Sequence, residues 1–425
     1  MLTTIISFII VFGILVFVHE FGHFIVAKKC GIMVREFSIG MGPKLFFYRH
    51  NHTTYTIRLL PLGGYVRLAG SEDDEEDAIK PGTVVKIQLN DKGVVTKIDL
   101  SKKNQLFKGI PFQVSDADLV NGLWIEGYEN GNEDDKKRLS VDHDALIVQR
   151  DGIEVQIAPA DVQFQNAPVG KKLLVNFAGI FNNILLAILA FMLLAFLQGG
   201  VGTNSNKVNV SDSTPHVAKT AGIKDGSRIL AVNGVKIKNF QDIAKQIEKQ
   251  PNKKVKLTIE DKNKTRDVSL VTDSKQMNKQ KIGVIGVTQT LDTSFGAKVM
   301  AGFTTTWSMA KGLFGALWQM ISGHFTLNSL GGPVAIFANT SEATSMGLTG
   351  IIQFLGWLSI NLAIVNLIPI PGLDGGKILL NIIQLIRGKA LSEKTEMIVT
   401  MIGFVFLAGL MILVTWNDIM RYFIR

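Results

Sequence analysis

The stretch His19-Glu20-Phe21-Gly22-His23 ends an apolar run that begins at Met1. Residues four apart lie on the same face of a helix, so His19 and His23 can present two imidazoles to one metal ion. Glu20 would then lie beside the water that the metal activates, which is the HExxH pattern of zinc hydrolases. Residues 1–18 contain no charged side chain, so this polar motif follows a segment suited to a bilayer interior, where ionisable groups are costly.

The composition indicates a multi-pass membrane protein that carries soluble insertions. Hydrophobic residues make up 47% of the 425 residues, only 19% are charged, and the apolar residues are gathered in long blocks. The single cysteine, Cys30, excludes an intramolecular disulfide and a Cys-rich zinc site, so a metal would depend on His and carboxylate ligands. The net charge of +9 is spread out without a basic stripe interleaved with aromatics, which argues against nucleic-acid binding.

The apolar blocks predict an α-helical membrane protein with about four transmembrane helices. They cover roughly residues 2–27, 173–197, 350–368 and 397–416. No Lys or Arg precedes the first helix, whereas Lys28 and Lys29 follow it. The positive-inside rule therefore predicts that both termini lie outside the bacterial cell membrane and that the HEFGH motif lies toward the cytoplasmic side.

After the first helix the apolar pattern changes to that of strands. Tyr55–Leu59 and Tyr65–Leu68 alternate on either side of Pro61-Leu62-Gly63-Gly64, which is a turn signal. We therefore expect a membrane-associated β-hairpin within residues 31–70. It is either an ordinary cytoplasmic hairpin or an edge strand that pairs with an extended substrate, and in the second case Gly63 and Gly64 would bind substrate.

Two soluble segments are also predicted. Residues 71–170 indicate a β-rich cytoplasmic insertion, which opens with an acidic, solvated loop at residues 71–77. Residues 200–290 are hydrophilic and would be extracellular. Within them a strand and an Asn-Gly turn precede an amphipathic helix at Phe240–Glu248 and a strand at Val255–Ile259. This order resembles an α+β PDZ domain, which binds extended peptides or C-termini beside a strand.

The third predicted span ends in a second chemically distinctive stretch, Asn366-Leu367-Ile368-Pro369-Ile370-Pro371-Gly372-Leu373-Asp374-Gly375-Gly376. Its two prolines and three glycines predict an unwound segment, which a membrane tolerates only where the backbone is buried in protein or lines a wet cavity. Catalytic zinc needs three protein ligands and one open position. We assign Asp374 as the third ligand beside His19 and His23, the alternative being a turn or capping carboxylate. Glu20 would take a proton from water and pass it to the leaving nitrogen.

Three asparagines, Asn176, Asn182 and Asn183, lie in the first half of the second predicted span. Unpaired amides are costly there. They either form hydrogen bonds between helices, or one of them faces the metal cavity and holds the substrate backbone or the oxyanion.

Together these motifs make the chain resemble the site-2 proteases, a family of zinc intramembrane metalloproteases, and specifically the bacterial branch that cleaves anti-sigma factors. The resemblance covers nearly the whole chain, through HEFGH, the segment from Asn366 to Gly376, and a single PDZ domain between the second and third spans. It implies one Zn²⁺ ion held by His19, His23 and Asp374, with Glu20 as catalytic base. It also implies regulated proteolysis within the membrane spans of single-span proteins or signal-peptide remnants.

The family's second-span motif, Gly-Pro-x-x-Asn, reads Gly179-Ile180-Phe181-Asn182-Asn183 in this chain and lacks the proline. Its last position makes Asn183 the expected equivalent. Asn183, Asn366, Gly63 and Gly64 are therefore the expected substrate-binding residues. Two other functions fit the same residues: a zinc-binding membrane transporter, and a PDZ-bearing membrane scaffold with a structural metal. Glu20 separates them, because hydrolysis needs a base beside the water and metal transit does not.

The predicted organisation follows these motifs along the chain. Its segments are the first transmembrane helix (1–30), the hairpin region (31–70), the cytoplasmic insertion (71–170), the second transmembrane helix (171–199), the extracellular PDZ domain (200–290), an interfacial amphipathic helix with a linker (291–346), the third transmembrane helix (347–376), a cytoplasmic loop (377–395) and the fourth transmembrane helix with the C-terminus (396–425).

Overall fold

The computed structural model describes residues 1–70, 79–101, 109–132, 134–149, 152–211, 216–262, 264–277, 280–323 and 330–424. The chain forms two compact units, one made of Met1–Ile188 with Thr306–Arg425 and the other of Leu189–Thr305. The acidic run predicted at residues 71–77 lies outside the described residues.

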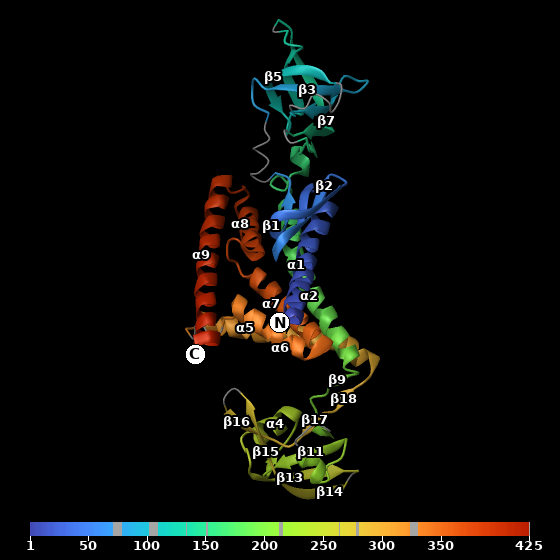
Figure 1. The fold of residues 1–425 in the computed structure, drawn as a ribbon, viewed down its shortest axis with the longest axis vertical. Coiled ribbons are helices and arrows are strands. Elements are labelled where there is room, and N and C mark those ends of the chain that lie inside the picture. The colour runs from blue at the N-terminus through green and yellow to red at the C-terminus, as the bar shows by residue number, and fades with distance from the viewer. Residues whose placement is uncertain are drawn as a thin grey trace. The chain divides into compact units, whose positions relative to one another are not determined.

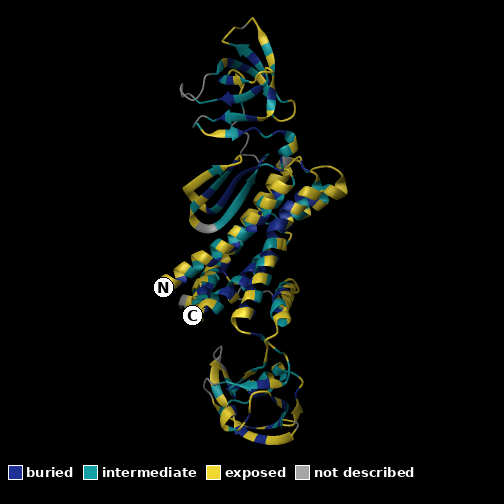
Figure 2. Cartoon of the chain, turned by 90° about the vertical axis from the view of Figure 1, so that its right-hand side faces the viewer, coloured by how far each residue is buried: buried dark blue, intermediate teal, exposed yellow. Residues whose placement is uncertain are grey.

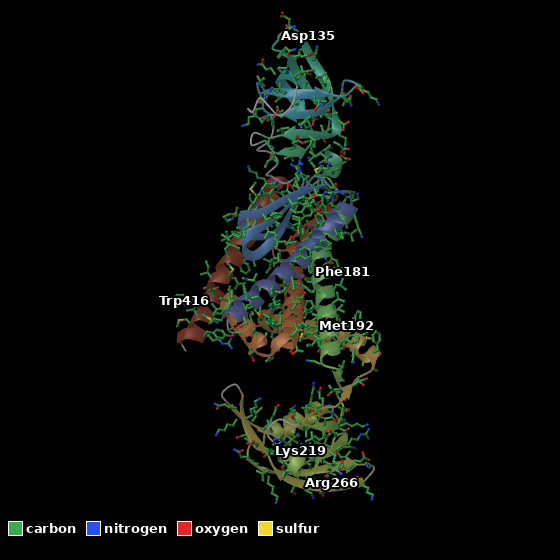
Figure 3. All side chains as sticks on the ribbon, turned by 45° about the vertical axis from the view of Figure 1, so that its right-hand side comes forward. Asp135, Phe181, Met192, Lys219, Arg266 and Trp416 are labelled. Atoms are coloured by element: carbon green, nitrogen blue, oxygen red, sulfur yellow. The ribbon has the colours of Figure 1, made fainter. Side chains whose placement is uncertain are left out.

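Four helices in the described residues are long and apolar enough to cross a membrane, as the apolar blocks predicted (Figure 1). They are α1 (Leu2–Lys29), α2 (Val169–Leu197), α7 (Gly347–Leu367) and α9 (Glu393–Ile419). Many of their apolar side chains face outward, where the yellow colour of Figure 2 marks exposed residues. Phe181 on α2 and Trp416 on α9, both labelled in Figure 3, are 53% and 68% exposed. Apolar side chains on the outside of a helical bundle are the expected lipid-facing surface.

The described residues after the second unit's sheet also include the helices α5 (Phe295–Ile321), α6 (Pro333–Ser345) and α8 (Asp374–Arg387). Helix α5 covers most of the predicted interfacial helix. Helix α6 corrects the prediction of a linker, because Gly332 and Pro333 begin a helix in which Pro333 occupies a first-turn position that needs no amide proton. Helix α8 likewise replaces the first part of the loop predicted at residues 377–395.

A buried carboxylate on α9 holds the N-terminus of α6. Asp418, which is 1% exposed, accepts hydrogen bonds from the backbone N–H groups of Gly332 at 2.9 Å and Ala335 at 3.0 Å. The first N–H groups of a helix have no partner within the helix, and an acidic side chain there also complements the helix dipole. Asp418 therefore ties the last apolar helix to the helices that pack around α1.

The hairpin consists of two long strands, β1 (Val34–His50) and β2 (Thr53–Leu68), which lie against α1 (Figure 1). Its turn is at Asn51 and His52, whose φ angles are 46° and 60°, and not at the predicted Pro61–Gly64 stretch, which lies within β2. Asparagine tolerates this left-handed conformation better than most residues. Residues 36–39 of β1 pair on one side with residues 64–67 and on the other with residues 54–57, so the hairpin curls into a small sheet.

The insertion that follows β2 is β-rich, as predicted. Its six-stranded sheet runs in the order β4-β3-β5-β6-β7-β8, and an additional pairing of β4 with β7 closes it around Ile98, Phe112 and Ile125. The strands are β3 (Val84–Leu89), β4 (Val95–Asp99), β5 (Ile110–Asp118), β6 (Trp124–Glu129), β7 (Lys136–Val148) and β8 (Glu154–Gln156). The 3₁₀ turn η2 (Ala160–Val162) then leads to α2.

The second unit contains the predicted strand, Asn-Gly turn, helix and strand. Strand β11 (Ser227–Val232) and the turn at Asn233 and Gly234 precede α4 (Phe240–Glu248), whose N-terminus is capped by the side chain of Asn239. The main sheet has the order β14-β13-β11-β10-β17, with β12 paired to β11. Its core consists of Ile229, Ile243, Leu257 and Ile259 with their neighbours.

The other described strands and helices of this unit are β9 (Val201–Gly202), β10 (Lys207–Val210), α3 (Val217–Thr220), β12 (Val235–Lys236), β13 (Lys254–Asp261), β14 (Lys264–Val271), β15 (Asp273–Met277), β16 (Gln280–Val284), β17 (Val287–Gln289) and β18 (Leu291–Asp292).

Candidate metal centre

His19, His23 and Asp374 come together in the helical part of the first unit. The Oδ2 atom of Asp374 lies 3.3 Å from Nε2 of His19 and 3.2 Å from Nε2 of His23, and the two Nε2 atoms are 3.3 Å apart. One ligand atom from each residue lies within 4.8 Å of the other two. The structure thus brings together two residues of one helix and a third that is about 350 positions further along the chain.

The helix break that the prolines and glycines predicted positions Asp374. Helix α7 ends at Leu367, residues 368–373 are not helical, and Asp374 is the first residue of α8. A carboxylate in the first turn of a helix is stabilised by the free N–H groups and the dipole of that turn. The break therefore aims a carboxylate at the two histidines, which lie one turn apart on α1.

These residues fit a zinc ion. Asp374 is 9% exposed, and its Oδ2 atom faces the two imidazole Nε2 atoms but forms no hydrogen bond of good geometry with any described residue. A buried carboxylate oxygen without a donor is costly unless a cation satisfies it. Two imidazoles and one carboxylate are also a donor set of catalytic zinc sites, in which the fourth position is open to water or substrate.

The other ring nitrogens of the two histidines have partners of their own. Nδ1 of His23 lies 2.7 Å from the backbone oxygen of Val175, and Nδ1 of His19 lies 3.0 Å from Nδ2 of Asn183. Asn183 is 0% exposed and its Oδ1 atom has no partner among the described residues, so turning the amide by 180° lets Oδ1 accept from a protonated Nδ1 of His19. Partners on Nδ1 leave both Nε2 atoms free to bind metal.

Gly179 is a part of the site that sequence reasoning did not single out. A Cβ atom at this position of α2 would overlap the ring atoms of both His19 and His23. Only glycine lets α2 approach the two histidines this closely. Gly179 is the first residue of the Gly-Ile-Phe-Asn-Asn motif, but the motif alone does not show which residues occupy the space beside this glycine.

Strand β2 passes beside Glu20. A Cβ atom on Gly64 would lie 3.1 Å from Cγ of Glu20 and 2.8 Å from Cγ1 of Val16. Gly64 therefore sits directly against the helix face that carries the predicted base. Gly63 precedes it on β2 with a φ angle of 85° and faces Met41.

The asparagines of the predicted spans have different surroundings. Asn182 donates from Nδ2 to the backbone oxygen of Val18 at 3.0 Å, a hydrogen bond between α2 and α1. The backbone oxygen of Asn183 accepts from Ser359 Oγ at 2.7 Å, which joins α2 to α7. Asn366 lies half-buried near the end of α7 and is not part of the cluster of His19, His23 and Asp374.

Comparison with known proteins places these residues in a family. A family model described as peptidase family M50 matches residues 7–410. The protein named "Probable protease eep" of Enterococcus faecalis is 48% identical over 422 residues, which are 99% of both chains. A "Putative zinc metalloprotease" of Streptococcus pyogenes serotype M1 is 45% identical over 426 residues, again 99% of both chains. One of the same description from Lactococcus lactis is 44% identical over 439 residues and covers both chains completely.

Proposed function

The chain belongs to peptidase family M50, the site-2 proteases, and is a zinc-dependent intramembrane endopeptidase; from this premise we propose that His19, His23 and Asp374 hold the ion and that Glu20 is the general base. The observation that carries the assignment is the convergence of three ligand atoms within 4.8 Å. When bound, zinc supplies Lewis-acid chemistry that makes water a nucleophile near neutral pH.

The proton transfer and the positioning of the two histidines are assigned to protein groups. Glu20 follows His19 on α1, and in this role it takes the proton from the attacking water and delivers it to the leaving nitrogen of the scissile amide. Asn183 and the backbone oxygen of Val175 hold the two imidazoles by their Nδ1 atoms. We therefore interpret Asn183 as a positioning residue of His19, because its side-chain amide is fully buried against that ring.

The substrate enters this site as an extended chain, because the amide of a helical residue is shielded by its own hydrogen bonds. The segment of β2 at residues 64–67 supports this role, since it pairs with β1 on one side and lies beside Glu20 at Gly64. A substrate backbone added to this strand would be held parallel or antiparallel to it next to the base. Gly63 gives the strand its local bend, and Asn366 is a further candidate for holding the unwound substrate.

The proposed substrates are single-span membrane proteins, including anti-sigma factors and signal-peptide remnants. The apolar outer faces of α1, α2, α7 and α9 support a location in the lipid bilayer. We further propose that both termini lie outside and that the metal centre lies toward the cytoplasm. Lys28 and Lys29 in the last turn of α1 support this orientation.

We assign the second unit a PDZ-like role in binding extended peptides or C-termini. A cavity of about 570 Å³ lies between α4 and the segment at residues 282–288. Apolar side chains of α4, including Phe240, Ile243 and Ile247, line it. A groove between a helix and a strand segment suits a peptide that lies beside the strand and places alternate side chains against the helix. Loss of binding when the C-terminus of a bound peptide is amidated would identify carboxylate recognition.

The activity is tested with the full chain reconstituted in liposomes together with a single-span model substrate. We expect cleavage by the wild type, abolition by a zinc chelator, and a loss of about 100-fold or more in Glu20→Gln. The zinc content of Glu20→Gln should equal that of the wild type, because Glu20 is not a ligand. Cleavage that survives this substitution would rule out Glu20 as the base. Zinc uptake into the liposomes without any cleavage would instead support the transporter alternative.

A second experiment tests the strand. Gly64→Val places a branched side chain against Glu20, Val16 and the backbone oxygen of Ser38, and should lower cleavage without removing zinc. Gly13→Ala is the matched control on α1, because a Cβ atom there meets nothing within 4 Å. Equal cleavage by Gly64→Val and the wild type would exclude the proposed path of the substrate.

A further inference from the structure

A cavity of about 630 Å³ lies away from the metal centre, between the β1–β2 hairpin and the β-rich insertion. Its hairpin wall carries the cations Arg35, Lys44, Arg49 and Arg67, and its other wall comes from β5, β7, β8 and the segments that follow β5 and β8. Such a concentration of cations raises the local concentration of anions inside a low-dielectric cavity.

The two carboxylates that line this cavity are already engaged elsewhere. Glu36 accepts from Arg58 Nη2 at 2.9 Å and from Thr56 Oγ1 at 2.8 Å. Asp118 accepts from the backbone N–H groups of Val120, Asn121 and Gly122 at 2.8–3.0 Å. The hydrogen bonds of both carboxylates thus go to Arg58, Thr56 and backbone N–H groups, and not to Lys44, Arg49 or Arg67.

The cavity cations include a donor without an acceptor. The Nε atom of Arg67 is buried and has no hydrogen-bond partner among the described residues. Among the residues that the structure describes, no salt bridge joins Lys44, Arg49 or Arg67 to a carboxylate, although Glu36 and Glu154 act electrostatically on Lys44 and Arg49. A buried guanidinium nitrogen without an acceptor is unfavourable, so the site is incomplete without an anion.

We propose that this cavity binds a phosphate group carried on a partly apolar molecule. Arginine guanidinium groups recognise phosphate through paired N–H donors, and lysine adds a point charge. Phe47, Leu119, Ile147 and Ile153 line the same cavity and would cover an apolar body next to the phosphate. An anionic phospholipid and a soluble phosphorylated compound share this chemistry.

A ligand bound in the cavity would influence the metal centre through strand β2. Arg67 and Gly64 lie three residues apart on β2 and pair in one ladder with Glu36 and Ile39 of β1. The Gly64 end of this ladder touches Glu20, whereas the Arg67 end lines the cavity. A phosphate held by Arg67 and Arg49 would order the strand that receives substrate, so we expect it to increase the rate of cleavage. This last step rests on the proposed proteolysis, whereas the binding site does not.

Binding is measured on the full chain by two arms that distinguish the sources of phosphate. In the first, protein from phosphatidylcholine nanodiscs containing phosphatidylglycerol is examined by native mass spectrometry for retained phosphatidylglycerol. In the second, inorganic phosphate is added to protein in pure phosphatidylcholine nanodiscs and its ³¹P line width is recorded. We expect retention or broadening with the wild type and a loss of at least tenfold in Arg49→Gln/Arg67→Gln.

The matched control is Lys236→Gln/Lys254→Gln, which removes two exposed cations of the second unit and should bind like the wild type. Because Arg67 is partly buried, Lys44→Gln/Arg49→Gln provides a second cavity variant that leaves Arg67 in place. Retention of phosphatidylglycerol alone identifies a lipid, and broadening of phosphate alone identifies a soluble ligand. Absence of both signals, or equal signals in the cavity variants and the control, would overturn the proposal.

The activity arm is kept separate from the binding arms. Addition of the bound probe should raise cleavage by the wild type and leave the Lys44→Gln/Arg49→Gln rate unchanged. A protein that binds phosphate in the cavity but cleaves no substrate would contradict the proposed proteolysis, whereas the proposed phosphate site would be supported.

Discussion

The side-chain amide of Asn183 lies 3.0 Å from Nδ1 of His19, the ring nitrogen that faces away from Asp374. An amide oxygen in this place fixes the imidazole tautomer whose Nε2 atom is available to zinc. Ser359 holds the backbone of the same residue at 2.7 Å. The metal centre is therefore supported by α2 and α7 as well as by the helices that carry its ligands.

Replacement of Asn183 by Leu should weaken zinc binding by about 10-fold to 100-fold, because His19 loses its partner. Asn183→Asp keeps an oxygen acceptor and should retain more affinity than Asn183→Leu. Competition with a fluorescent zinc chelator measures both. Asn182→Ala is the control, since Asn182 bonds to the backbone of Val18 and not to a ligand; equal losses at the two positions would contradict the assigned role.

Gly179→Ala should reduce both zinc content and cleavage, because the new methyl group would overlap the rings of His19 and His23. Gly170→Ala makes the same chemical change on the same helix at a position where a Cβ atom meets nothing within 4 Å. Zinc content by elemental analysis and cleavage in liposomes are compared for the two variants. Identical behaviour would show that α2 does not pack against the ligands as described.

Asp374→Asn keeps the volume of the side chain and removes its negative charge. If Asp374 is the third ligand, bound zinc should fall well below one ion per chain at a chelator concentration that leaves the wild type loaded. Cleavage should fall with it. Full zinc occupancy in this variant would mean that another residue completes the site.

The pH dependence of the insertion follows from His143 on β7. The hydrogen bond to Asp144 at 3.0 Å, followed by the contact with Asp161 of η2 at 3.2 Å, raises the pKa of His143 above its ordinary value. Because the pKa of His143 is raised, its interaction with the two carboxylates is fully present below about pH 6.5 and is lost as the pH rises through the raised pKa. The three side chains are exposed, so this interaction contributes at most about 1 kcal/mol to the free energy of unfolding.

Amide hydrogen exchange at residues 160–163 measures this contact at pH 6 and pH 8.5, after correction for the intrinsic rates. We expect weaker protection at the higher pH in the wild type and no such difference in His143→Asn. A difference of equal size in His143→Asn would assign the pH dependence to another group.

The membrane spans and the meeting of His19, His23 and Asp374 could be predicted because the motifs behind them are local patterns. A run of 18 or more apolar residues predicts a span by itself, and HEFGH places two histidines on one helix face wherever that helix lies. The helix break before Asp374 was predictable in the same way, because prolines and glycines interrupt helices locally. Phe240–Glu248 was predicted with its observed bounds from its amphipathic period.

The predictions were wrong where contacts between distant parts of the chain outweighed the strongest local sequence signal. Pro61–Gly64 is a stronger turn signal than Asn51-His52, yet the chain turns at the latter, because the pairing of β1 with both parts of β2 decides the register. Helix α6 lies in the segment predicted as a linker, and its N-terminus depends on Asp418, 86 residues away from Gly332. Gly179 could not be assigned a role because its neighbours come from another helix.

The distance along the chain between the ligands has a consequence for biosynthesis. About 350 residues separate His23 from Asp374, and at roughly 5–20 residues per second a ribosome needs about 20–70 s to make them. With Asp374 as third ligand, the nascent chain holds two histidines and a base but no complete zinc site throughout that interval. On this assignment the protease is inert during most of its own synthesis.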